Sequence, residues 1–176
     1  MSYPYFEVVR RTAQHGLDLS DRSQSGNQFR LWLSIWALDV VNESVEVSTA
    51  KTEHEEMVEL GDVIWGVCAS AMLVGLAEKD IIPSDPVEGI KVGPYMPNLQ
   101  QDKLIRRASQ YADYAKKVAR DDRPIDRSQF ANLLSRVFYS VARCGDPAAA
   151  AEAMNQKLLK RYPNGYTAAD SINRNV

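Results

Sequence analysis

Residues 43–62 read ESVEVSTAKTEHEEMVELGD and contain two acidic motifs, Glu43-x-x-Glu46 and Glu59-x-x-Asp62, separated by twelve residues. Each motif lies in a run that we expect to be helical, and residues three apart lie on one face of a helix. Two such helices packed antiparallel would bring four carboxylates together. Clustered carboxylates repel one another unless a cation lies among them, and an all-oxygen donor set suits Mg²⁺ or Mn²⁺. The stretch therefore predicts a helical hairpin with a metal site at these four acids.

The two helices of this hairpin extend well beyond the acidic motifs. Apolar residues recur at helical spacing over 28–50, which predicts the first helix. The second helix is expected from 52 to about 78. Thr52 and Glu55 have the spacing of a capping box, in which the two residues satisfy each other's backbone N–H groups at the start of a helix.

The rest of the chain also reads as helix, apart from a proline-rich stretch over 81–99 that predicts a loop. No segment reads as a strand, so the sequence predicts one all-α domain over 1–176, a bundle of about five to six helices. Four further helices are expected, at 5–15, at 100–120, from Asp126 or Ser128 to Cys144, and from Pro147 to Arg161.

The two halves of the chain, 28–80 and 100–163, resemble each other. When the second helical pair is aligned on the first, Gln110 falls at the position of Glu46 and Arg136 at the position of Asp62. This register predicts a degenerate tandem repeat in which only the first half keeps the acids. The alternative is that the two halves are unrelated, since any two amphipathic helical hairpins can be aligned this well.

Composition, charge and cysteine content limit the kinds of protein that this chain can be. The chain has 176 residues, 45% of them hydrophobic and 25% charged, which is ordinary for a globular domain. The formal net charge of −2 gives no indication of nucleic-acid binding. Cys68 and Cys144 lie in apolar runs and are expected to be buried free thiols. We expect neither a signal peptide nor a membrane span, and hence a cytoplasmic location.

A second block of sequence lies near the C-terminus. Residues 155–166 read NQKLLKRYPNGY, and SINR follows at 171–174. Together with the two acidic motifs and the ELGDVIW segment, these residues resemble the MazG-like all-α nucleoside triphosphate pyrophosphohydrolases, in particular the phage-type members. The resemblance covers roughly 36–77 and 151–174. K-L-x-x-R-Y-P-x-G joined to both acidic motifs in one short helical chain is a specific combination.

The resemblance implies hydrolysis of a (deoxy)nucleoside triphosphate to the monophosphate and pyrophosphate, with Mg²⁺ or Mn²⁺ as cofactor. It implies a homodimer or homotetramer, and catalytic metal ligands at Glu43, Glu46, Glu59 and Asp62. Lys157 and Arg161, four residues apart, match positions that contact phosphate. Their charges would offset a triphosphate that the acids alone repel. Asn155, Tyr162 and Tyr166 are the further candidate substrate-binding residues.

The chain departs from the family pattern in three places. Asn42 stands where a third acid often precedes the first glutamate, and Glu55 stands where some members have a lysine. The segment 80–150 separates the two blocks by more than a single-copy member needs. A fused pair of repeats would explain that spacing, and the dimeric dUTPase branch of the superfamily has a comparable tandem arrangement.

Three functions remain open on the sequence. The first is a pyrophosphohydrolase for a purine deoxynucleotide such as dGTP, the second a dUTPase-like enzyme, and the third a helical regulator that binds a nucleotide without hydrolysing it. The three tryptophans, Trp32, Trp36 and Trp65, are expected in the core, with stacking of one of them on a base as the alternative. A di-iron carboxylate bundle is excluded because it needs Glu-x-x-His motifs, which neither histidine forms.

Overall fold

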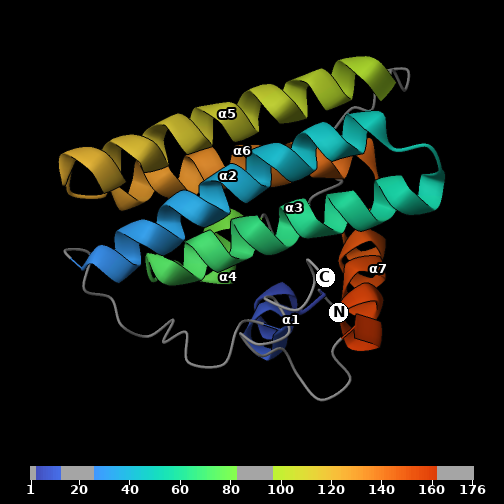
Figure 1. Ribbon diagram of the computed structural model, residues 1–176, viewed down its shortest axis with the longest axis horizontal. Helices are drawn as coiled ribbons and strands as arrows, with labels where there is room; N and C mark the ends of the chain where they lie inside the picture. The colour runs from blue at the N-terminus through green and yellow to red at the C-terminus, as the bar shows by residue number, and fades with distance from the viewer. Residues whose placement is uncertain (1–2, 13–25, 83–96, 162–176) are drawn as a thin grey trace, which may run out of the picture.

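The computed structural model describes residues 3–12, 26–82 and 97–161, and the elements within these ranges are all helices (Figure 1). This confirms the predicted all-α fold. None of the described helices has the length and apolar character needed to cross a membrane. The helices are α1 (Tyr5–Thr12), α2 (Asn27–Thr49), α3 (Glu53–Leu73), α4 (Glu78–Ile81), α5 (Pro97–Asp121), α6 (Arg127–Cys144) and α7 (Pro147–Arg161).

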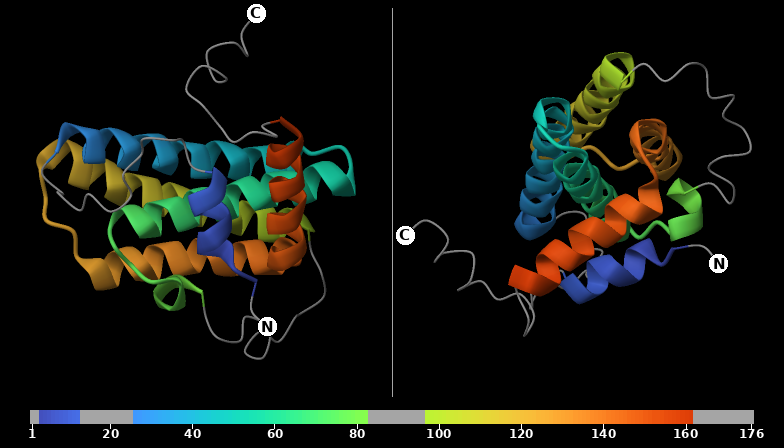
Figure 2. Two further views of the ribbon diagram at one scale, coloured as in Figure 1. Left: turned by 90° about the horizontal axis from the view of Figure 1, so that it is seen from below. Right: turned by 90° about the vertical axis from the view of Figure 1, so that its right-hand side faces the viewer.

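Four long helices form an antiparallel bundle. The hairpin of α2 and α3 packs on the hairpin of α5 and α6, with α2 against α5 and α3 against α6 (Figure 1). Helix α7 crosses one end of the bundle against α3, and α1 lies beside both α3 and α7 (Figure 2). The two hairpins therefore follow each other in the same order, as the predicted tandem repeat requires, although the duplication itself stays a prediction.

Helices α3 and α6 begin at predicted capping residues, although one of the expected hydrogen bonds has a different donor. The Thr52 hydroxyl accepts the backbone N–H of Glu55 at 3.1 Å, but the Glu55 carboxylate accepts from the N–H of Lys51 at 2.8 Å rather than from that of Thr52. At the start of α6 the cap is Asp126, whose carboxylate accepts the backbone N–H of Gln129 at 3.0 Å. Each cap satisfies one backbone donor that the helix itself leaves unpaired.

Helix α3 ends at Leu73, five residues before the expected end near Glu78. Gly75 adopts a positive φ of 70°, a conformation that glycine reaches without steric cost. The N–H of Leu76 then donates to the carbonyl of Ala71 at 2.9 Å, and the N–H of Gly75 to that of Met72 at 3.0 Å. This is the Schellman pattern, which ends a helix, and the single turn of α4 follows it. The expected end of the first helix at His15 lies outside the described residues.

The core joins all the long helices. Tyr111 of α5 and Phe130 of α6 are fully buried and pack edge to face, with ring centroids 5.6 Å apart. The Tyr111 hydroxyl donates to the Ser70 hydroxyl of α3 at 2.6 Å, so the polar end of the buried ring is satisfied. Cys68 and Cys144 are buried free thiols, as predicted.

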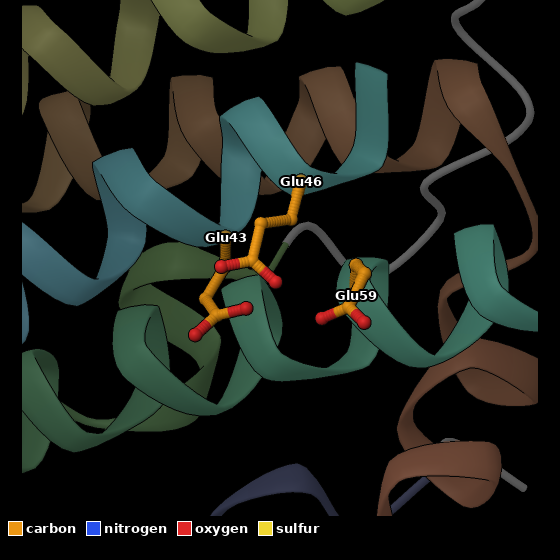
Figure 3. A group of neighbouring side chains, drawn as sticks. All are labelled: Glu43, Glu46 and Glu59. Atoms are coloured by element: carbon orange, nitrogen blue, oxygen red, sulfur yellow. The ribbon is translucent and has the colours of Figure 1, made fainter. Parts of the chain in front are cut away.

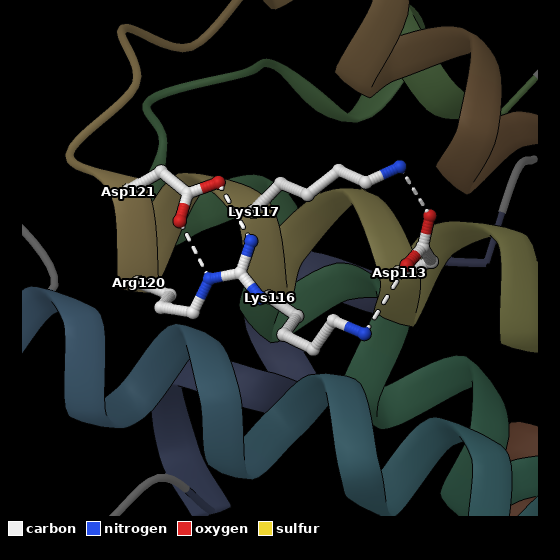
Figure 4. Close-up of polar contacts among 5 residues, drawn as sticks. All are labelled: Asp113, Lys116, Lys117, Arg120 and Asp121. Carbon is white, nitrogen blue, oxygen red and sulfur yellow. Dashed lines mark hydrogen bonds and ion pairs between the residues drawn. The ribbon is translucent and has the colours of Figure 1, made fainter.

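The exposed face of α5 carries a local network of charges. Lys116 and Lys117 both pair with Asp113, at 3.3 and 2.6 Å, and Arg120 pairs with Asp121 (Figure 4). The lysines hold the pKa of the Asp113 carboxyl below its usual value. Such exposed pairs add little stability. They do give each of the two acids a neighbouring cation.

Glycines on α3 allow two helices to approach its backbone. A Cβ atom at Gly61 would lie 2.3 Å from the carbonyl oxygen of Ala150 and 2.5 Å from the Cβ of Met154, both on α7. A Cβ at Gly66 would lie 2.7 Å from a methyl carbon of Val40 on α2. The absence of a side chain at Gly61 therefore sets the distance between α3 and α7.

Replacing Gly61 by alanine should destabilise the protein by about 1–3 kcal/mol, the usual cost of overpacking, because the obstacle is backbone. Gly66→Ala is the matched control: it adds the same methyl to the interior of the same helix, so both variants gain the same helix propensity. That methyl meets a side chain, which moves more readily than backbone, so the loss should be smaller. Urea unfolding of both variants measures the difference. Equal stability of Gly61→Ala and the wild type would contradict the proposed close packing.

Candidate metal centre

Three carboxylates converge between α2 and α3. Glu43 and Glu46 come from α2 and Glu59 from α3, and one oxygen of each lies within 4.8 Å of the others (Figure 3). Glu43 and Glu59 are half-buried and Glu46 is exposed. We call these residues the acid trio. The structure thus brings together three of the four acids that the sequence predicts as metal ligands.

The hairpin itself positions the trio. The turn between the helices is short, and α3 begins at the Thr52 cap, which fixes where its first turns lie against the end of α2. Because Gly66 lets Val40 of α2 approach the α3 backbone, the two helices run close together near the acids. The three-residue spacing then directs Glu43 and Glu46 to the same side of α2.

Asp62, the fourth predicted ligand, has a different partner. Its Oδ2 atom accepts a hydrogen bond from the ammonium group of Lys157 on α7, and the two side chains are only 20% and 24% exposed. A partly shielded pair of this kind is stronger than an exposed one because less water screens it. Asp62 therefore pairs with Lys157, a residue that the sequence assigns to phosphate.

The trio has an unusual protonation equilibrium. The pKa of Glu43 is raised to about 8, first by burial and then by the negative charge of Asp62. A hydrogen bond with Glu59 and the charges of Glu46 and Glu59 raise it further. Negative charge at Glu43 is thus costly when no cation is present, and a proton or a metal ion would relieve that cost.

The hairpin of α2 and α3 also carries three tryptophans that pack on one another. Trp32 and Trp36 of α2 lie with ring centroids 5.6 Å apart, and Trp36 packs edge to face on Trp65 of α3 at 6.0 Å. The indole N–H of Trp65 donates to the Thr12 hydroxyl of α1 at 2.8 Å. Trp36 is buried, as expected for the core, whereas Trp32 and Trp65 are half-buried and keep some exposed ring surface.

The remaining predicted site residues are only partly placed. Asn155 is buried in α7, and Arg161 is exposed at the last residue of that helix, one turn beyond Lys157. Tyr162 and Tyr166 lie outside the described residues. The assignment of these residues to substrate stays a prediction.

Sequence reasoning left out one further acid on the same helix. Asp39 lies on α2 one turn before Glu43 and is exposed, although partial desolvation raises the pKa of its carboxyl. Its four-residue spacing from Glu43 was the available signal, since residues four apart share a helix face.

The donor set of the acid trio fits a hard divalent cation. All three side chains offer carboxylate oxygens, the ligands that Mg²⁺ and Mn²⁺ prefer, and the described part of the cluster contains neither histidine nor cysteine. Lys157 supplies a positive charge at the edge of the cluster. Such an arrangement can hold a cation and accept a phosphate group beside it.

Comparison of the chain with known proteins returned no match among family models, curated proteins or solved structures.

The raised pKa of Glu43 predicts how stability depends on pH in the metal-free protein. Between the unfolded value of 4.5 and the folded value of about 8, the folded chain binds more protons, so the free energy of unfolding should fall as pH rises. Glu43→Gln should remove this part of the pH dependence and make the protein more stable than the wild type at pH 8. Urea unfolding in EDTA at several pH values tests this, with the exposed Glu53→Gln as control. Parallel profiles for wild type and Glu43→Gln would refute it.

Proposed function

We propose that this protein is a metal-dependent nucleoside triphosphate pyrophosphohydrolase of the MazG-like kind. The observation that carries the proposal is the convergence of Glu43, Glu46 and Glu59 from two helices beside the cation of Lys157. The N-x-K-L-x-x-R-Y-P-x-G segment of the sequence supports it independently.

In this proposal the acid trio holds Mg²⁺ or Mn²⁺, while Asp62, whose charge acts on Glu43, pairs with Lys157 beside it. A bound metal of this class supplies charge stabilisation at a phosphate and lowers the pKa of a coordinated water. The protein contributes the fixed carboxylates, which need no reorganisation because the hairpin already holds them together.

In this proposal the ammonium group of Lys157 has two possible hydrogen-bond acceptors. In the structure it donates to Asp62, and the same ammonium group can donate to a phosphate oxygen. Arg161, one turn further along α7, adds a second cation on the same side of the helix. These cations offset the repulsion between the acids and a triphosphate.

The tryptophans favour a nucleotide over an inorganic polyphosphate as the substrate. The half-buried rings of Trp32 and Trp65 can offer a flat apolar surface for stacking.

Two alternatives each have a supporting observation. The order of the two similar hairpins matches the tandem arrangement of dUTPase-like enzymes and favours dUTP over a purine nucleotide such as dGTP. The engagement of Asp62 by Lys157 favours a regulator that binds a nucleotide without hydrolysing it, since one of the four acids is then neutralised.

Turnover of the common ribo- and deoxyribonucleoside triphosphates, including dUTP, tests the proposal. Pyrophosphate should be released with Mg²⁺ or Mn²⁺ and not in EDTA. Glu59→Gln should lower kcat/KM by about a hundredfold or more, since even residues that only support metal ligands cost ten- to hundredfold when changed. Glu53→Gln, an exposed glutamate on the same helix, is the matched control and should remain active. Equal turnover by Glu59→Gln and wild type would refute the proposal, whereas nucleotide binding without pyrophosphate release would favour the regulator.

A further inference from the structure

The second hairpin contains three arginines close together: Arg107 of α5, and Arg136 and Arg143 of α6. The guanidinium of Arg107 donates to the backbone carbonyl of Arg136 at 3.0 Å and to the Ser140 hydroxyl at 2.9 Å. Arg143 donates to the side-chain oxygen of Gln100 at 3.0 Å. Ser140 and Gln100 are themselves buried, so two of the three guanidiniums have fixed positions. We call these three residues the arginine cluster.

The positive charge of the arginine cluster has no acidic partner in the described part of the chain. Each described ion pair involves other cations. On the same α5, Lys116 and Lys117 share Asp113 (Figure 4). Burial and the nearby charges of Arg136 and Arg143 lower the pKa of Arg107, so the Arg107 guanidinium lies close enough to the other two to be repelled by them. An anion would relieve this repulsion.

In the predicted tandem register, two members of the arginine cluster fall at positions that acids occupy in the first hairpin. The register that sets Gln110 on Glu46 also sets Arg107 on Glu43, while Arg136 falls on Asp62. The contact between Arg107 and Arg136 in α5–α6 thus corresponds to the proximity of Glu43 and Asp62 in α2–α3. At these two positions the charges are opposite in sign, so a ligand of the second hairpin should be an anion.

A hollow of about 650 Å³ adjoins the arginine cluster along α6. Its volume lies in the range of pockets for small organic molecules. Arg136 belongs to both features, which connects the cluster to the hollow. The hollow also offers hydrogen-bonding groups and an aromatic ring, with Arg127, Asn132, Arg136 and Tyr139 in its lining. Its lining also contains one acid, Asp80, whose carboxylate accepts the backbone N–H of Ala77.

We propose that the arginine cluster binds the phosphate groups of a nucleotide whose nucleoside part lies in the adjacent hollow. Guanidinium groups match phosphate oxygens in charge and in the spacing of their N–H donors. The site is separate from the acid trio and lies on the other hairpin, so it needs no metal ion. A compact cluster beside a hollow fits a small molecule better than a nucleic acid, which requires an extended basic stripe.

Calorimetric titration with inorganic tripolyphosphate in EDTA isolates the arginine cluster, because the metal-free acid trio repels a polyanion. Arg136→Gln and Arg143→Gln should each weaken binding roughly ten- to hundredfold, the range for a charge-assisted hydrogen bond. Arg120→Gln is the matched control, since this α5 arginine already pairs with Asp121. Arg161→Gln tests whether the cation of the proposed active site is responsible instead. Thermal melting verifies that each variant folds.

Titration with dGTP in EDTA tests the role of the hollow. The nucleotide should bind more tightly than tripolyphosphate, and Tyr139→Ala should remove that advantage while leaving tripolyphosphate binding unchanged. Four results would overturn the proposal: no binding of tripolyphosphate, binding that survives Arg136→Gln and Arg143→Gln, binding lost only in Arg161→Gln, or equal affinity for dGTP and tripolyphosphate. A single-stranded oligonucleotide that binds more tightly than dGTP would also overturn it and identify a nucleic-acid surface.

Discussion

The arrangement of the candidate site depends on how closely α7 approaches α3. At Gly61 the backbone of α3 has no side chain, and the carbonyl of Ala150 and the Cβ of Met154 lie in the space that one would fill. Helix α7 continues from this contact toward Lys157, which reaches Asp62, the residue next to Gly61. A wider separation of the two helices would leave Asp62 without its cation and the acid trio without a neighbouring positive charge.

Acidic and basic side chains are also separated within the chain. The net charge of −2 conceals an acidic surface between α2 and α3 and a basic one between α5 and α6. Among the described residues, no ion pair involves a member of either cluster, and the nearby Asp62 pairs with Lys157. Like charges that a hairpin holds close together raise the free energy of the ligand-free protein, and this favours binding of a ligand of opposite charge. The two clusters therefore indicate two different ligands, a cation and an anion.

Local sequence signals predicted the helices well because capping is local. Thr52 and Asp126 both begin helices where their side chains predict, while the end of α3 was missed although Gly75 signalled it. The acid trio was predictable because helical spacing and one hairpin bring it together. The pairing of Asp62 with Lys157 was not, since it depends on the angle at which a distant helix crosses α3. The arginine cluster was missed for the same reason, because Arg107 and Arg143 meet only across the packed helices.

Anomalous diffraction from crystals soaked in Mn²⁺ tests most directly whether the acid trio binds a divalent cation. We expect one manganese peak per chain among the carboxylates of Glu43, Glu46 and Glu59, and none beside Gln110, which the predicted tandem register aligns with Glu46. A map without a peak at the trio, or with peaks of equal height at both positions, would contradict it.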